Sequence, residues 1–139
     1  MPQARDLSLN GTGIEDRVRS PSGSEETPDT DSTSAVIANN GTLSNAVHVP
    51  DGEIVRGILT ASAWTAASLT FDVSVDDGVN YFSLAYPDGS EFIVTPSTTI
   101  ARFVPFPTVV GVSHIKARSG ISGTTTAQGA ERTLKFVIG

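Results

Sequence analysis

The sequence predicts an all-β protein, an antiparallel β-sandwich of jelly-roll type that carries an extended N-terminal arm. Residues 69–76 alternate strictly between apolar and polar side chains, which is the pattern of a strand with one face in a core. Thirteen glycines and eight prolines separate a series of short apolar runs. No segment keeps a helical period, and strands spaced by about ten residues with turns between them favour a sandwich.

The chain divides into two parts of different composition, and its 139 residues suit one folded domain. Residues 1–34 carry three basic and seven acidic side chains, and their stretch 20–34 consists of Ser, Thr, Pro, Gly, Asp and Glu. Such a stretch cannot bury enough apolar surface to offset the entropy lost on ordering. We therefore expect an acidic, polar arm at 1–34, flexible or ordered on a partner, and a sandwich domain at 35–139. The arm's isolated apolar residues are candidate partner contacts: Leu7, Leu9, Ile14 and Val18.

Each expected strand ends at a turn signal or a loop. The expected strands lie at residues 35–38, 43–49, 53–61, 69–76, 80–86, 91–95, 98–104, 112–118 and 133–138. The turn signals between them are Asn-Asn-Gly at 39–41, Pro-Asp-Gly at 50–52, Asp-Gly at 77–78 and Pro-Asp-Gly at 87–89. We expect a single helical turn at 63–67, a loop containing Pro105 and Pro107, and a Gly/Thr-rich loop at 120–129.

Charge and composition argue against several functions. The net charge is −6, and an acidic surface repels phosphate backbones, so we expect no nucleic-acid partner. No apolar run approaches the roughly 20 residues that span a bilayer, and no apolar segment of a signal peptide follows the first residues. The chain has no cysteine, which favours synthesis in a reducing cytoplasm. We therefore expect neither a membrane nor a nucleic acid among its partners.

Candidate catalytic groups are few. The only histidines are His48 and His114, and no nucleophile motif surrounds any serine. His114 alternates with Lys116 and Arg118, which indicates a solvent-facing strand surface. Most acidic residues of the domain fall in turns, where aspartate accepts local backbone hydrogen bonds. We therefore expect no catalytic residue and no enzymatic activity.

One group of oxygen-bearing side chains is a candidate calcium site. Asp72, Asp76, Asp77 and Asn80 are close in sequence and carry the ligand type that calcium prefers. Their spacing does not match an EF-hand loop, and a hairpin turn already accounts for the pair Asp77 and Gly78. We therefore expect neither a metal site nor a cofactor.

The aromatic residues suggest two kinds of contact surface. The segment 103–107 reads Phe-Val-Pro-Phe-Pro and is unusually apolar for a loop, so Phe103 and Phe106 are candidate partner contacts if exposed and a cap on the core if buried. A lone tryptophan in a small β-domain usually packs in the core, and we favour this interpretation for Trp64. The alternative is a sugar-binding role in which Trp64, Tyr81 or Tyr86 serves as a stacking platform.

Three motifs add a family resemblance. Residues 63–78 read Ala-Trp-Thr-Ala-Ala-Ser-Leu-Thr-Phe-Asp-Val-Ser-Val-Asp-Asp-Gly, residues 114–120 read His-Ile-Lys-Ala-Arg-Ser-Gly, and residues 128–134 read Gln-Gly-Ala-Glu-Arg-Thr-Leu. In this order and spacing they resemble small structural proteins of tailed bacteriophages and prophages, of the head-decoration (cement) or spike type. The likeness covers about residues 47–138 and leaves out the arm.

The resemblance implies a non-enzymatic structural protein of a virion. Its first expectation is a capsid decoration protein, a homotrimer on the capsid exterior that stabilises the shell by contacts with the major capsid protein after synthesis in the host cytoplasm. Two alternatives stay open. One is a carbohydrate-binding module of a tail fibre or spike, which would use the aromatic platform, and the other is a tail or baseplate adaptor.

Overall fold

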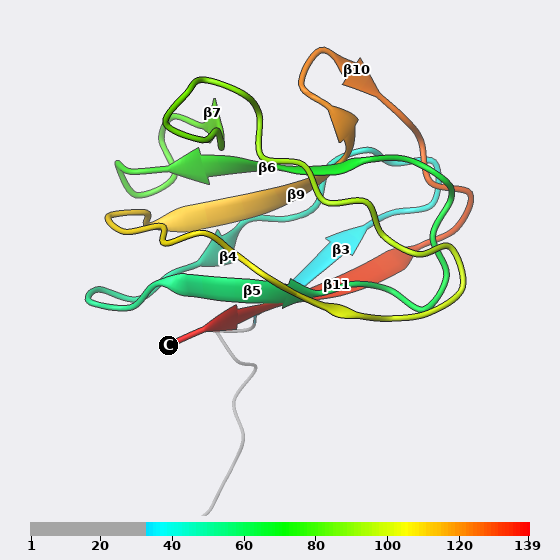
Figure 1. Cartoon of the computed structure of the whole chain (residues 1–139), viewed down its shortest axis with the longest axis horizontal. Helices are drawn as coiled ribbons and strands as arrows, with labels where there is room; N and C mark the ends of the chain where they lie inside the picture. The colour runs from blue at the N-terminus through cyan, green and yellow to red at the C-terminus, as the bar shows by residue number, and fades with distance from the viewer. Residues whose placement is uncertain (1–32) are drawn as a thin grey trace, which may run out of the picture. The chain divides into compact units, whose positions relative to one another are not determined.

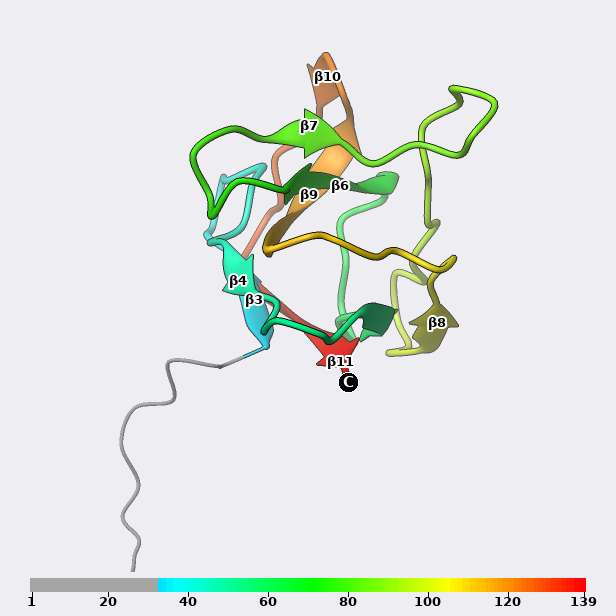
Figure 2. The same ribbon diagram turned by 90° about the vertical axis from the view of Figure 1, so that its left-hand side faces the viewer.

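A computed structural model of the chain describes residues 33–139 (Figure 1). Within this range the chain forms nine strands and no helix, and all the strand pairs are antiparallel. The strands form two sheets that lie over each other as two layers, which Figure 2 shows. The prediction of an all-β sandwich is therefore confirmed for these residues. The predicted arm lies outside them, apart from Thr33 and Ser34.

One layer is a five-stranded sheet and the other is a four-stranded sheet. In the five-stranded sheet the order is β10-β9-β6-β7, and β4 also pairs with β9. Its strands are β4 (Val47–His48), β6 (Leu69–Ser74), β7 (Phe82–Ser83), β9 (His114–Ile121) and β10 (Thr124–Thr125). The four-stranded sheet, in the order β3-β11-β5-β8, consists of β3 (Ser34–Ile37), β5 (Val55–Leu59), β8 (Phe103–Pro105) and β11 (Arg132–Ile138). The β6–β7 and β9–β10 connections stay within one sheet, whereas the other connections between these strands cross from one sheet to the other.

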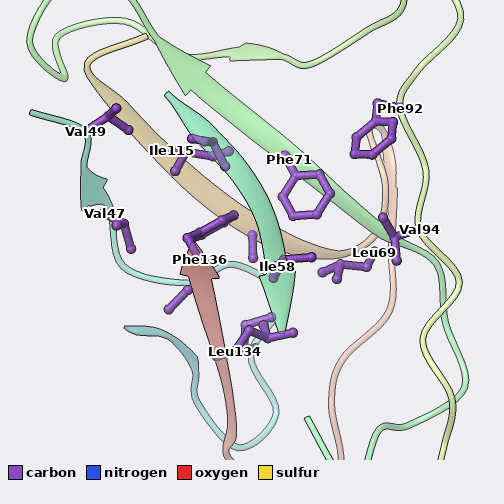
Figure 3. Packing of buried hydrophobic residues seen from close by; sticks show 14 of the residues in the cluster. Val47, Val49, Ile58, Leu69, Phe71, Phe92, Val94, Ile115, Leu134 and Phe136 are labelled. Carbon is purple, nitrogen blue, oxygen red and sulfur yellow. The ribbon is translucent and has the colours of Figure 1, made fainter. Parts of the chain in front are cut away.

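The core lies between the sheets because successive side chains of a strand point to opposite faces. Leu69 and Phe71 of β6 point inwards from one sheet, and Leu134 and Phe136 of β11 point inwards from the other (Figure 3). All four are essentially without solvent contact, as is Ile58 of β5. Burying each of these side chains contributes roughly 1.5–3 kcal/mol, so this cluster supplies the main stabilising free energy of the domain.

Several elements differ from the expected ranges for physical reasons. The stretch 91–95 forms only isolated bridges, in which Val94 pairs with Leu69 and Glu91 pairs with Ala85. Strand β9 continues through Gly120 into a hairpin with β10, so residues 120–129 are not one loop. Gly120 has a φ of 104°, and a Cβ there would lie 2.6 Å from the Thr125 backbone. The close approach of the two strands at this position therefore needs glycine.

The expected helical turn at 63–67 is also wrong, because a tertiary contact takes the backbone groups that a turn would use. The side chain of buried Gln128 accepts the backbone N–H of Thr65 at 2.8 Å and donates to the carbonyl oxygen of Thr65 at 3.2 Å. The segment is therefore held as an irregular loop against residue 128. Its sequence carries no sign of this distant partner.

The free edge of β3 is covered by a single side chain. The Oδ1 atom of Asn45 accepts the backbone N–H of Val36 at 2.8 Å, and its Nδ2 atom donates to the carbonyl oxygen of Ser34 at 3.2 Å. On its other side β3 pairs with β11. Asn45 therefore replaces a missing neighbouring strand and blocks the edge against pairing with another chain.

Replacing Asn45 with alanine is expected to destabilise the domain by about 1 kcal/mol and to loosen β3, because Val36 and Ser34 lose their partners. Amide hydrogen exchange of Val36 should become clearly faster than in the native chain, while the amide of Phe71 in β6 should change only with global stability. Equal acceleration at both amides would show that Asn45 does not protect this edge in particular.

Candidate functional site

Trp64 belongs to the core. It is 3% exposed, and its indole N–H donates to the carbonyl oxygen of Ala67 at 3.0 Å. A sugar platform needs an open ring face, so the structure contradicts this role for Trp64 and agrees with the packing interpretation.

The two tyrosines have different neighbours. Tyr81 is half-buried on the outer face of the five-stranded sheet, where the ammonium group of Lys116 stands 4.1 Å from its ring centre. Tyr86 is exposed, and its ring meets Phe92 edge-on with 5.4 Å between ring centres. Tyr86 also borders an open hollow of about 380 Å³ with the apolar residues Pro107 and Val109. The structure therefore does not join Trp64, Tyr81 and Tyr86 into one platform.

Phe103 is a surface residue, whereas Phe106 is partly buried and packs against the core. Phe103 on β8 is 53% exposed and remains a candidate contact. The ring of Phe106 packs edge-on against Phe71 at 4.8 Å and against Phe92 at 5.0 Å between ring centres. The candidate contact at Phe106 is thus corrected, because this side chain caps the core as the alternative interpretation has it.

The two histidines lie directly opposite each other in the β4–β9 pair, with 5.2 Å between the ring centres of His48 and His114. His114 is half-buried, and its Nδ1 atom lies 3.2 Å from the Oγ atom of Ser113. Their distance in sequence hides this pairing. Within the described part of the chain, no group of three or more His, Cys, Asp or Glu side chains could hold a metal ion.

Arg118 is buried, which corrects the predicted solvent-facing surface at this end of β9. Its guanidinium group is ion-paired with Asp72 on the neighbouring strand β6, and its Nη1 atom lies 3.5 Å from a carboxylate oxygen of Glu91. Glu91 also accepts the backbone N–H of Ser122 at 3.1 Å. These charges compensate one another inside the domain, so the cluster holds β6, β9 and the 91–95 segment together.

The carboxylate of Asp76 organises the β6–β7 loop. It accepts the backbone N–H of Asn80 at 2.9 Å, the side-chain amide of Asn80 at 2.8 Å and the hydroxyl of Ser74 at 2.8 Å. These hydrogen bonds, the backbone one first, lower the pKa of Asp76 from 3.8 to about 2. The oxygen groups weighed as calcium ligands therefore serve the fold, since Asp76 binds Asn80 and Asp72 binds Arg118.

Asp76→Asn is expected to remove an acid-sensitive contribution to stability. The folded pKa lies below the unfolded one, so the carboxylate stabilises the fold fully above the unfolded pKa of 3.8, and this contribution is lost as the pH falls through about 2. The difference in Tm between the native chain and the variant should therefore be constant near neutral pH and shrink below about pH 4. Thermal unfolding followed by circular dichroism measures it. Asn80→Ala should reproduce part of the effect, and a difference that persists unchanged at the acid end would contradict this account.

The outer face of the four-stranded sheet is largely apolar. Because Ile58, Leu134 and Phe136 point into the core, the residues next to them in β5 and β11 point outwards. This surface, which we call the sheet face, consists of Leu59, Phe103 and Val137 with Lys135 between them.

The sheet face depends on a glycine. A Cβ at Gly57 would lie 2.5 Å from the ring of Phe103, so the ring occupies the place that any other side chain would need. Phe103 and Leu59 are direct cross-strand partners. The sheet face is therefore one continuous apolar surface across β8, β5 and β11.

A second exposed surface is formed by three loops at the end of the sandwich drawn on the left in Figure 1. We call this surface the loop end, and it comprises residues 50–53, 75–80 and 108–113. Val75, Val79 and Val110 are 66%, 76% and 69% exposed there. The loops enclose an open hollow of about 200 Å³, whose lining includes Asp51, Glu53, Val75 and Asp77.

Sequence reasoning missed most of these contact residues. An apolar residue in a short strand reads as core, and only the direction of its neighbours shows that Leu59 and Val137 face outwards. Val75 shares its parity with the inward residues of β6 but lies beyond the end of the strand, where the chain has turned. Exposed valines in loops could have been noticed from the sequence, because loops are commonly polar.

Fold and surface together define the described part of the chain as an all-β sandwich domain with two exposed apolar surfaces. Comparison of the chain with protein-family models, with curated proteins and with solved structures finds no match. Residues 33–139 contain no helix that could span a membrane. The candidate contacts of the arm lie outside the described residues: Leu7, Leu9, Ile14 and Val18.

Proposed function

We propose that the chain is a non-enzymatic structural protein of a tailed-phage virion, a capsid decoration protein that stabilises the shell through protein–protein contacts. The observation that carries the proposal is the exposed sheet face of Leu59, Phe103 and Val137. Apolar side chains gathered on the surface of a small domain mark a contact with another protein. The motif resemblance supplies the virion setting.

The use of the polar side chains supports a role in contact rather than in chemistry. Arg118 is engaged by Asp72 and Glu91, and Asp76 is engaged by Asn80. In active sites, by contrast, catalytic side chains commonly have a pKa that is shifted by burial or by neighbouring charges. The carboxyl group with the largest pKa shift described here is Asp76, and local loop hydrogen bonds lower it.

In this proposal the partner is the major capsid protein, and the chain sits on the capsid exterior as a homotrimer. A decoration protein bridges neighbouring capsid subunits, so each apolar contact adds to the free energy that holds the shell together. The N-terminal arm remains a predicted second contact. Deleting residues 1–30 should reduce capsid occupancy at unchanged Tm, and undiminished occupancy would overturn the role of the arm.

The copy number and position of the chain in intact virions test the proposal directly. Quantitative mass spectrometry should find hundreds of copies in a fixed ratio to the major capsid protein, and electron microscopy of the particles should place them on the outer surface of the shell. A few copies at the tail would instead support the tail or baseplate adaptor. Absence of the chain from purified particles would overturn any virion role.

The carbohydrate-binding alternative has little geometric support, because Trp64 is buried and Tyr81 is covered on one side by Lys116. Tyr86 keeps an exposed ring beside the hollow with Pro107 and Val109. Binding on a glycan array that disappears in Tyr86→Ala at unchanged Tm would favour this alternative over a decoration protein.

A further inference from the structure

The sheet face combines apolar side chains with positive charge only. The four strands β3, β5, β8 and β11 carry three basic residues and no acidic one. Two of them are used within the domain, since the guanidinium of Arg132 donates to Gln128 and Thr65 and the Nε atom of Arg56 donates to the carbonyl oxygen of Gly139. Lys135 lies between Ser34 and Leu59 on the outer face. This surface is thus electropositive in a chain whose net charge is −6.

The loop end has the opposite character. Residues 50–53 and 75–80 contain Asp51, Glu53, Asp76 and Asp77 and no basic residue, and these are half of the eight acidic residues after position 34. Exposed Val75 lines the hollow together with Asp51, Glu53 and Asp77, and Val79 and Val110 are exposed in the same loops, with Val110 on the side that borders the hollow beside Tyr86. The loop end therefore offers apolar side chains framed by carboxylates, and the sheet face offers apolar side chains beside an ammonium group.

We infer that the sheet face of one copy binds the loop end of a second copy. The two surfaces match each other in both apolar exposure and charge. Pairing two sheet faces would place two Lys135 ammonium groups in one interface, and pairing two loop ends would place eight carboxylates in one interface. Like charges in contact are unfavourable, so the complementary pairing is head-to-tail.

A head-to-tail contact determines the kind of assembly that forms. Each copy has one sheet face and one loop end on different sides of its sandwich (Figure 2), so it can contact two neighbours at once. Repeated contacts of this type close into a ring when the rotation permits. The inference concerns the purified chain and goes beyond the proposed function, because it assigns an interface whether or not the protein sits on a capsid.

Two single variants test the interface separately. Phe103→Asp places a carboxylate on the sheet face, and Val110→Asp adds one to the loop end. Each should weaken self-association of the full chain by about thirtyfold or more, as expected for loss of a central interface contact, and give monomers in sedimentation velocity at concentrations where the native chain is oligomeric. Lys135→Glu serves as a second sheet-face variant and should have the same effect if Phe103→Asp perturbs β8.

Mixing the two variants gives the decisive result. A Phe103→Asp copy retains an intact loop end, and a Val110→Asp copy retains an intact sheet face. The mixture should therefore form a one-to-one dimer and nothing larger, although each variant alone is monomeric. A symmetric interface between identical surfaces cannot produce this complementation, because each mixed pair would still contain a damaged copy of the shared surface.

Ile93→Asp is the matched control. Ile93 is also exposed, but it lies at the opposite end of β6 from the loop end. Its neighbour Val94 pairs with Leu69 at the start of β6, whereas the loop end follows Ser74 at the end of that strand. The control should associate like the native chain. A native chain that is monomeric at high concentration, or a mixture that stays monomeric, would overturn the inference. Either result leaves the virion proposal to be decided by copy number, so the two can fail separately.

Discussion

Phe71→Ala is expected to lower the free energy of unfolding by about 3–5 kcal/mol, the largest effect of any single substitution proposed for this domain. Phe71 has no solvent exposure, and its ring contacts those of Phe92, Phe106 and Phe136 with 4.8 to 5.9 Å between ring centres. Both sheets and two connecting segments meet at this ring. The residual cavity should cost as much as the lost transfer free energy, because neighbours held from both layers relax only in part.

Urea denaturation followed by tryptophan fluorescence measures this change, with Trp64 as the single tryptophan of the chain. Phe82→Ala is the matched control, because Phe82 on the neighbouring strand β7 is 63% exposed. The control should change the unfolding free energy by about 0.5 kcal/mol or less. Similar losses in both variants would show that the aromatic cluster around residue 71 is not the centre of the core.

Arg118→Met is the second large prediction, with an expected loss of about 3 kcal/mol. Methionine fills a similar volume but leaves the carboxylates of Asp72 and Glu91 without their ion-pair partner in a place where water reaches them poorly. Two like charges would then face each other across the gap. The cost therefore arises from the stranded carboxylates more than from the attraction that is lost.

Lys116→Met is the control for this substitution, since Lys116 stands two residues earlier on the same face of β9 and rests on Tyr81. It makes the same chemical change and should cost less than about 1 kcal/mol. Combining Arg118→Met with Asp72→Asn should recover part of the stability, because one stranded charge is removed. A double variant less stable than Arg118→Met alone would contradict this explanation.

The core strands could be predicted from local patterns. Leu69 and Phe71, like Leu134 and Phe136, stand two residues apart in their strands and are buried together, because the period of a strand is fixed by backbone geometry. The turn after β6 could also be predicted. Asp77 and Gly78 adopt φ values of 62° and 85°, which Gly tolerates freely and Asp more readily than most residues.

The buried polar groups could not be predicted in the same way. Arg118 and Gln128 read as surface residues, yet Gln128 is fully buried between Thr65, Ser119 and Arg132. Their partners lie far away in sequence. A hydrogen bond that joins residues 65 and 128 depends on how two sheets are stacked, and no local pattern records that arrangement.

The candidate partner contacts, too, could be predicted only in part from the sequence. Segment 103–107 could be recognised as apolar from its composition, but only the packing shows that Phe103 is exposed and that Phe106 is partly buried against the core. Both side chains are phenylalanines. Phe103 lies on the outer face of β8 over Gly57, whereas Phe106 follows the end of the strand and its ring turns towards the core. Leu59 and Val137 join Phe103 through cross-strand neighbours that only sheet pairing brings together.

By itself the sequence determined that this chain folds into an all-β domain and which of its strands are apolar on one face, because alternation and turn chemistry act over a few residues. The tertiary structure alone decided which apolar and charged side chains remain outside. That choice depends on the order of strands in the two sheets, which places Lys135 beside Leu59 and gathers the acidic loops at one end. Binding surfaces combine residues that are far apart in the sequence, so they can be identified only from the tertiary structure.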